Sequence, residues 1–194
     1  LLIDQYQIGW DKAWNITNAS VAYTNHTLLP EALEKWDLGL FNDLLPRHLE
    51  IIYEINWRFL QQLRLRYPGD DKILQKLSII DEEGSKSVRM AHLATIGAHH
   101  INGVAALHSD LIKRQLLPEF AELWPEKFTN VTNGVTPRRW VALSNPSLSN
   151  LLEKEVGADW ITNMELLKNL ETKKDDASFL QKFEESKLIE IGRA

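Results

Sequence analysis

The sequence contains no cysteine, which excludes disulfide bonds, thiolate metal sites and cysteine nucleophiles. Nine glycines and seven prolines in 194 residues are too few for a fibrous or low-complexity protein. No apolar run reaches the roughly 18 residues that a membrane-spanning helix needs, so we expect no membrane span. The formal net charge of -5 lacks the positive excess with which proteins bind nucleic acid or an anionic membrane. An ordinary globular chain remains, 44% hydrophobic and long enough to bury a core.

Four Asn-X-Ser/Thr sequons occur in the chain, at Asn15, Asn18, Asn25 and Asn130. No signal peptide and no cysteine point to secretion, so we interpret the sequons as chance occurrences and expect a cytoplasmic protein. The first residue is leucine rather than methionine, which suggests that the chain begins inside a larger protein.

The spacing of apolar residues predicts a helix-rich chain with a few short strands. The clearest helix runs from Phe41 to Leu63, with Pro46 in its first turn or at a kink near its start. Glu54 and Arg58 are expected to pair on its outer face. A further helix is expected over residues 11–19, with Asp11 as N-cap, and another from Pro30 onward. The remaining expected helices are 70–78, 107–117, 138–143, 146–155 and 163–191, the last with a break near 173–176. Short strands are expected over 21–24 and 127–130.

One stretch fits two kinds of element. Residues 88–96 are compatible with a buried strand or a helix, and periodicity does not separate the two. The high alanine content and the poor alternation favour a helix over 90–106. The most loop-like stretch of the chain is 132–137, Thr-Asn-Gly-Val-Thr-Pro.

A first candidate ligand site lies on the connection that follows the expected strand at 21–24. Asn25, His26 and Thr27 combine backbone N–H groups with small polar side chains, which suits a hydroxyl-rich ligand. A plain helix cap with an exposed histidine explains the same residues, and local sequence alone favours that simpler explanation.

The histidines suggest a metal site. Those concerned are His92, His99, His100 and His108, of which the first two are spaced to share one face of a helix. No cysteine is available and no carboxylate is spaced to complete a site, so we expect core or interface histidines and no metal.

Two further groups remain ambiguous. Residues 132–140 place two adjacent arginines after a loop, which suits phosphate, but a loop and a capped helix explain the run equally well. Arg47, Glu50, Tyr53 and Glu54 lie on the polar flank of the long helix, where the tyrosine could stack on a sugar face, although a solvated helix face is the simpler explanation. No catalytic-triad order and no nucleotide-binding or zinc-protease motif occurs. Patterns alone indicate a soluble, mostly helical domain.

Four longer blocks carry a resemblance to a known family. They are AYTNHTLLPEALEKW at 22–36, LLPRHLEIIYEIN at 44–56, RMAHLATIGAHHINGVAALHSDLIK at 89–113 and FTNVTNGVTPRRWVALSNP at 128–146. In this order and spacing they resemble the α-glucan phosphorylases, the family of glycogen, starch and maltodextrin phosphorylases. The resemblance runs from about Leu1 to about Leu170.

The resemblance implies a fold and a reaction. The family has two Rossmann-like lobes facing across a cleft, the GT-B arrangement, so we expect a helix-rich α/β chain that is part of such a fold. Its members use pyridoxal phosphate and inorganic phosphate to remove glucose 1-phosphate from the end of an α-1,4-glucan, by general acid catalysis at the glycosidic oxygen. The complete enzyme is expected to be a homodimer.

The resemblance also implies roles for individual residues. His26 matches the histidine that faces the glucose at the cleavage point, and Thr27 follows it in the same wall. Glu34 matches a carboxylate that lines the pocket, and Asn133 the asparagine that binds the glucose 6-hydroxyl. Trp140 matches a tryptophan near the cofactor.

A remote polymer-binding surface is implied as well. Arg47, Tyr53 and Glu83 resemble part of such a surface in glycogen-type members, where some carry an amide in place of Glu50. The loop after Gly84 is read as one residue shorter than in those members.

The expected organisation is that of an internal fragment. We assign residues 1–130 to the end of the N-terminal lobe and 131–194 to the inter-lobe junction and the start of the C-terminal lobe. The cofactor lysine lies outside this chain, so the chain alone is expected to be inactive. The alternatives are a catalytically dead glucan-binding module and a helical scaffold without a ligand.

Overall fold

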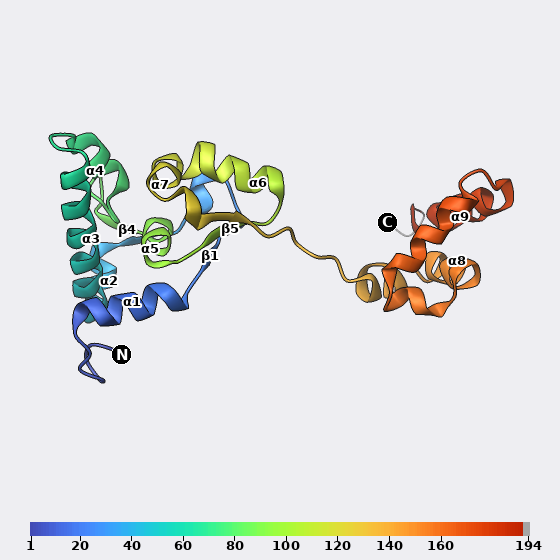
Figure 1. The fold of residues 1–194 in the computed structure, drawn as a ribbon, viewed down its shortest axis with the longest axis horizontal. Coiled ribbons are helices and arrows are strands. Elements are labelled where there is room, and N and C mark those ends of the chain that lie inside the picture. The colour runs from blue at the N-terminus through green and yellow to red at the C-terminus, as the bar shows by residue number, and fades with distance from the viewer. Residues whose placement is uncertain (192–194) are drawn as a thin grey trace. The chain divides into compact units, whose positions relative to one another are not determined.

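The computed structural model describes residues 1–191, and its contacts divide the chain into two compact units, Leu1–Asn133 and Gly134–Ala194 (Figure 1). Each unit has its own helices, and the first also holds two small sheets. The predicted helix-rich α/β class is therefore confirmed. The assignment of residues 1–130 and 131–194 to parts of two lobes stays a prediction.

Most of the first unit is helical. Its α-helices are α1 (Trp10–Ser20), α2 (Leu38–Leu44), α3 (Pro46–Arg66), α4 (Asp71–Leu77), α5 (Met90–Gly97), α6 (Ala106–Leu111) and α7 (Pro118–Leu123), and its shorter helices are η1 (Pro30–Ala32), η2 (Ile112–Leu116) and η3 (Pro125–Lys127). Pro46 occupies the first turn of α3, where a missing N–H costs no helical hydrogen bond. The predicted long helix is confirmed in that form, with a break at Leu45 between α2 and α3.

The first sheet is parallel, with the order β1-β5-β6. Its strands are β1 (Tyr23–Thr24), β5 (Ile101–Gly103) and β6 (Phe128–Asn130). Helix α6 packs closely against the end of β5, because a Cβ atom on Gly103 would lie 2.6 Å from the Ser109 hydroxyl and 2.8 Å from the Ser109 backbone nitrogen. Only glycine leaves room for this contact, as is common where a helix meets a strand end.

The second sheet is antiparallel, with the order β2-β4-β3. Its strands are β2 (Lys35–Asp37), β3 (Ile80–Asp81) and β4 (Ser87–Arg89). A hydrophobic core runs from this sheet along α3 to the parallel sheet and α7. At its centre Phe59 of α3 stacks on Phe120 of α7, with ring centroids 6.1 Å apart.

The second unit is helical. It contains η4 (Arg138–Leu143), α8 (Pro146–Val156), η5 (Ala158–Ile161), η6 (Met164–Lys173) and α9 (Ala177–Ile191) around the fully buried Trp160. The predicted break near 173–176 is confirmed, and the Asp176 side chain accepts hydrogen bonds from the first backbone N–H groups of α9. Gly157 ends α8 with a φ of 87°, which a glycine adopts without strain.

Two predicted helices and one predicted helix cap are wrong. Pro30 begins a single 3-10 turn rather than a helix, because the chain turns back at Lys35 to pair with β4. The helix over 90–106 ends at Gly97, and Ile101–Gly103 is instead the central strand of the parallel sheet. Asp11 lies in the first turn of α1, while Gly9 holds the N-cap position. Strand pairing outweighs helix propensity in the first two cases.

His92 connects α5 to the core. Its Nδ1 lies 3.0 Å from the Ser78 carbonyl oxygen, and its ring packs edge-on against Phe120 with centroids 5.1 Å apart. A carbonyl oxygen can only accept, so we assign the ring proton to Nδ1. Burial and the charge of Arg89 lower the pKa of His92 from 6.5 to about 4.

This shift makes stability depend on pH. The unfolded chain binds a proton at His92 near pH 6.5, whereas the folded chain binds it only near pH 4, so stability is full above pH 6.5 and declines as the pH falls to 4. The loss is roughly 3 kcal/mol. Urea unfolding followed by tryptophan fluorescence should show the decline, and His92→Asn should flatten it. A matched exposed variant, His48→Asn, should leave the slope intact; equal slopes in His92→Asn and the parent would contradict this assignment.

Candidate functional site

The carboxyl ends of the three parallel strands meet at one edge of their sheet, and polar loops follow them there. The β1 loop carries His26 and Thr27, and the β6 loop carries Asn133. In open α/β sheets, ligands bind beyond this carboxyl edge. The geometry of the two loops is therefore the first test of the predicted site.

Asn25 holds the loop that follows β1. It is 2% exposed, and its backbone N–H donates to the Asn102 carbonyl oxygen at 2.9 Å, which extends the pairing of β1 with β5. Its side-chain oxygen accepts from the Thr27 N–H at 3.1 Å, and its side-chain nitrogen donates to the Tyr23 hydroxyl at 3.1 Å. The backbone at His26 is thus fixed from both sides, while the His26 side chain is exposed.

The loop that follows β6 is held by the other side of β5. The Asn133 N–H donates to the Val104 carbonyl oxygen at 3.0 Å, and the Val131 N–H donates to the Gly103 carbonyl oxygen at 3.2 Å. The Asn133 side chain is exposed. The structure therefore brings His26, Thr27 and Asn133 to one sheet edge, with β5 as the shared support.

Three residues that were not predicted from the sequence brace this edge, namely Ser109, Asn130 and His108. The Ser109 hydroxyl donates to the Asn130 side-chain oxygen at 2.7 Å, and the Asn130 side-chain nitrogen donates to the Thr132 hydroxyl at 3.1 Å. The Val104 N–H donates to Nδ1 of His108 at 3.1 Å. The available signal was Gly103, which disfavours a helix and was overlooked when a helix was predicted over 90–106.

Glu34 lies apart from this cluster in its contacts. Its carbonyl oxygen accepts from the Met90 N–H at 3.1 Å, and its carboxylate accepts from the Trp36 indole nitrogen at 3.3 Å. Within residues 1–191, no hydrogen bond or ion pair joins Glu34 to His26 or Asn133. Trp140 belongs to the second unit, where it lies on η4 and is 63% exposed.

The three residues of the predicted polymer surface lie on α3 and on the turn between β3 and β4. Arg47 donates to Asp4 at 2.7 Å and to Glu50 at 2.8 Å, which raises the pKa of the Arg47 guanidinium and lowers the pKa of the Asp4 carboxyl. Tyr53 is 45% exposed. Glu83 accepts from the Gln75 side chain at 3.3 Å. Arg47 is thus engaged with Asp4 and Glu50 rather than with Tyr53 or Glu83.

The predicted Glu54–Arg58 pair on α3 is confirmed, with Nε of Arg58 at 2.6 Å from the Glu54 carboxylate.

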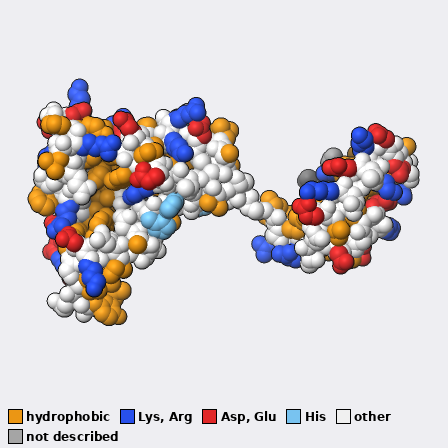
Figure 2. Space-filling model, viewed as in Figure 1, with side chains coloured by type: hydrophobic (Ala, Val, Ile, Leu, Met, Phe, Trp, Pro, Cys, Tyr) orange, Lys and Arg blue, Asp and Glu red, His pale blue; other side chains and the backbone are white. Residues whose placement is uncertain are grey.

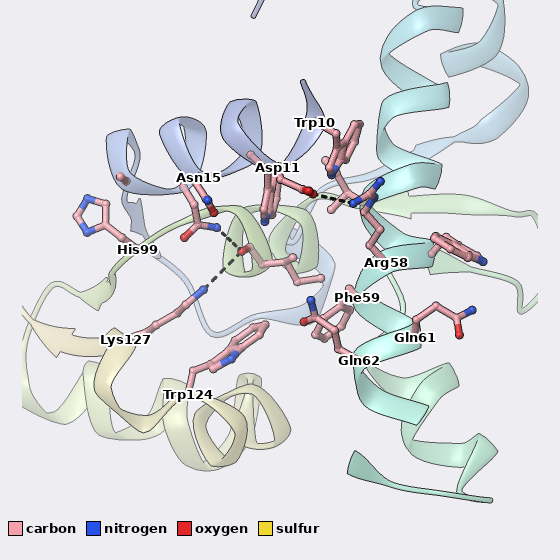
Figure 3. Close-up of a pocket in the computed structure, with 16 residues that line it drawn as sticks. Trp10, Asp11, Asn15, Arg58, Phe59, Gln61, Gln62, His99, Trp124 and Lys127 are labelled. Atoms are coloured by element: carbon pink, nitrogen blue, oxygen red, sulfur yellow. Dashed lines mark hydrogen bonds and ion pairs between the residues drawn. The ribbon is translucent and has the colours of Figure 1, made fainter. Parts of the chain in front are cut away.

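The first unit also contains an open cavity of about 840 Å³, which no pattern in the sequence had indicated (Figure 3). It lies between α1, α3 and the segment around Trp124, and Figure 2 shows hydrophobic side chains gathered over α3 on the same unit. Lys127 lies 4.1 Å from the centroid of the Trp124 ring, and burial lowers the pKa of this lysine. His99 is among the lining residues, but none of the predicted substrate residues is. The cavity is distinct from the sheet edge.

The histidines do not share a helix face as predicted, because α5 ends at Gly97, before His99 and His100. Within the described part of the chain, no group of three or more histidine, aspartate or glutamate side chains is placed to hold a metal ion. No helix between residues 1 and 191 has both the length and the apolar character to cross a membrane.

Comparison with known proteins gives a consistent answer. The family model described as carbohydrate phosphorylase matches residues 1–191. The chain is 63% identical over 181 residues to a glycogen phosphorylase of Synechocystis, covering 93% of this chain and 21% of that protein. It is 50% identical over 188 residues to a glycogen phosphorylase of Chlamydia trachomatis, covering 97% of this chain and 23% of that protein. The brain-form glycogen phosphorylase of Rattus norvegicus is 48% identical over 93% of this chain and 22% of its own length.

The chain thus spans about a fifth of the length of these relatives. The family model covers both compact units, so the resemblance found in four blocks extends over the whole described sequence. The chain belongs to the carbohydrate phosphorylase family.

Proposed function

We propose that this chain forms part of an α-glucan phosphorylase, which transfers the terminal glucose of an α-1,4-glucan to inorganic phosphate and releases glucose 1-phosphate. The observation that carries the proposal is the sheet edge at which β5 supports the loops of His26 and Asn133 together. Family membership and the names of the relatives, all glycogen phosphorylases, support the same reaction. The proposed location is the cytoplasm, and the proposed complete enzyme is a homodimer of two-lobed GT-B subunits.

The roles of the edge residues follow from their chemistry. The exposed Asn133 amide can donate to and accept from a sugar hydroxyl, for which we propose the glucose 6-hydroxyl. His26 presents its ring beside a backbone that Asn25 holds fixed, so it can line the pocket at the cleaved bond without reordering. Thr27 completes that wall. Glu34 makes no contact with these edge residues and its carboxylate accepts from Trp36, so its proposed role as a pocket carboxylate rests on the family resemblance alone.

The proposed cofactor is pyridoxal phosphate, whose phosphate group supplies a partner for proton transfer with the substrate phosphate. The exposed indole of Trp140 fits a contact against a planar ring system. The lysine that would carry the cofactor is expected outside this chain. The proposed contribution of this chain is therefore to bind and orient the glucan.

The isolated chain should release no glucose 1-phosphate from glycogen and phosphate above a heat-inactivated control. Catalysis requires cofactor, phosphate and glucan to be held together, and proximity accounts for much of the rate. The matching control is a chimera in which this chain replaces the segment of the Synechocystis glycogen phosphorylase that it matches over 181 residues. This chimera should be active. An inactive but folded chimera would favour the alternative of a glucan-binding remnant without catalysis.

In that chimera Asn133→Ala should lower kcat/KM for glucan. Loss of a directional contact to a sugar hydroxyl costs about 1–3 kcal/mol, or roughly 5- to 150-fold in kcat/KM. Asn169→Ala removes an exposed amide elsewhere and should have no effect. Steady-state kinetics on maltoheptaose would decide. If both variants match the parent, Asn133 is not a substrate residue.

The polymer surface can be tested by the length of the substrate. Tyr53→Ala in the chimera should raise KM for glycogen, because it removes a polymer contact whose hydroxyl hydrogen bond alone is worth about 0.5–1.5 kcal/mol. Turnover of maltoheptaose should stay nearly unchanged, because the proposed surface is separate from the site at the sheet edge. Tyr6→Ala removes another exposed tyrosine of the first unit and serves as the control. Equal impairment on long and short substrates would assign Tyr53 to packing alone.

A further inference from the structure

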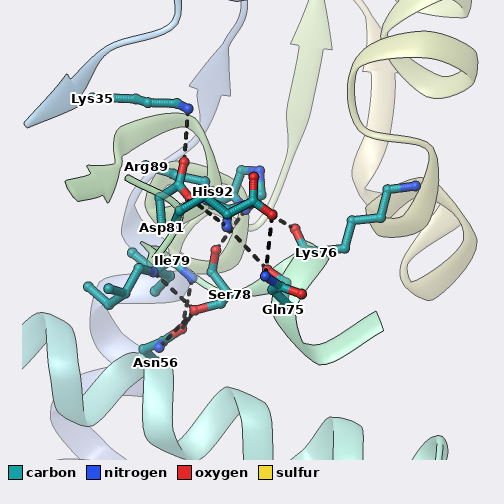
Figure 4. A network of polar contacts seen from close by, with 11 residues as sticks. Lys35, Asn56, Gln75, Lys76, Ser78, Ile79, Asp81, Arg89 and His92 are labelled. Atoms are coloured by element: carbon teal, nitrogen blue, oxygen red, sulfur yellow. Dashed lines mark hydrogen bonds and ion pairs between the residues drawn. The ribbon is translucent and has the colours of Figure 1, made fainter. Parts of the chain in front are cut away.

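A polar network on the second sheet is centred on the Asp81 carboxylate (Figure 4). This carboxylate accepts from the Lys35 ammonium at 2.9 Å and from the Glu83 backbone N–H at 3.2 Å, and it lies 3.5 Å from the Arg89 guanidinium. The Asp81 side chain is only 13% exposed. The hydrogen bond from Lys35 is the largest cause that lowers the pKa of Asp81, so the group is a carboxylate at neutral pH.

Arg89 ties the same network to α4. Its guanidinium donates to the carbonyl oxygens of Lys76 at 3.2 Å and of Gln75 at 3.1 Å, two groups in the last turn of that helix. A helix ends in carbonyl oxygens without helical partners, and an arginine is well suited to satisfy them. The Gln75 side chain in turn donates to the Glu83 carboxylate at 3.3 Å.

These contacts form a closed ring around one residue of the turn between β3 and β4. Asp81 accepts a hydrogen bond from the Glu83 backbone N–H, and the Gln75 side chain donates to the Glu83 carboxylate. Arg89 closes the ring, because it pairs with Asp81 and donates to the Gln75 carbonyl oxygen. Nε of Arg89 is buried and has no hydrogen-bond partner among the described residues, while another nitrogen of the same guanidinium forms the ion pair with Asp81. Loss of the Asp81 charge would therefore weaken its contacts with Lys35, Arg89 and the Glu83 backbone together.

We infer that Asp81 is a positioning residue for glucan binding, which fixes the β3–β4 turn so that the Glu83 carboxylate faces the polymer in one orientation. This inference rests on the polymer surface of the proposed function. A carboxylate binds sugar hydroxyls through short, directional hydrogen bonds, so its orientation matters more than its charge alone. Asp81 itself is too buried to contact a polymer.

The test is Asp81→Asn in the chimera, with Asp43→Asn as the matched control, since Asp43 is an exposed carboxylate on α2. Asparagine keeps the shape of the side chain, but it removes the charge that faces Lys35 and Arg89. We expect KM for glycogen to rise about 5- to 10-fold, with kcat/KM for maltoheptaose within about twofold of the parent. The control should match the parent on both substrates.

A merely structural role would give a different result. If Asp81→Asn lowers the melting temperature and impairs glycogen and maltoheptaose equally, the inference is overturned. If the variant does not fold, Lys35→Met removes one donor to the same carboxylate from its exposed side. Lys35→Met should also lower kcat/KM for glycogen relative to kcat/KM for maltoheptaose. If this ratio of the two kcat/KM values stays at that of the parent, the inference is overturned.

The outcome also separates this inference from the proposed surface. If Tyr53→Ala changes the ratio of kcat/KM for glycogen to kcat/KM for maltoheptaose but Asp81→Asn does not, the polymer surface is supported and the positioning role of Asp81 is wrong. If neither variant shifts it, the polymer surface itself is wrong. If Asp81→Glu, which keeps the charge, recovers part of the glycogen KM, that recovery supports positioning by the carboxylate.

Discussion

The backbone pairing of β5 with strands on both sides is the constraint on which the first unit depends. Its three residues lie between β1 and β6. The carbonyl oxygens of Asn102 and Gly103 in β5, and of Val104 just beyond it, accept hydrogen bonds from the two loops that follow β1 and β6. These bonds join segments that are far apart in the sequence, and buried backbone groups must be paired somewhere. The core packs against this sheet through α3 and α7, so the sheet, the core and the candidate site share one support.

The two sheets have different consequences for function. The parallel sheet ends in exposed polar side chains, His26 and Asn133, on backbones that are held by hydrogen bonds. The antiparallel sheet instead buries a charged side chain, Asp81, beside a turn that carries exposed ones. The first arrangement leaves its polar groups open to a ligand, whereas the second uses its buried charge to fix the local backbone.

The sequence predicted the elements whose information is local. Helix α3 follows from its apolar spacing, and Pro46 marks its start. Strands β2 and β5 could not be predicted, because three residues such as Ile-Asn-Gly carry little periodicity and gain their hydrogen bonds from distant partners. The polar residues at 25–27 already indicated a candidate site, and the family resemblance added the predicted roles of His26, Thr27 and Asn133. The meeting of these residues at one edge depends on non-local strand pairing. The cavity beside Trp124 was not predicted for the same reason, since four separate parts of the chain line it.

The tight packing at Gly103 limits how this site can vary. A single methyl group there would overlap the backbone of Ser109, so α6 would have to move as a body. That helix carries Ser109 and His108, which brace the loop after β6 and the backbone after β5. A substitution that touches no ligand would thus displace two loops at once, and random mutagenesis of the chain should find position 103 among its least tolerant sites.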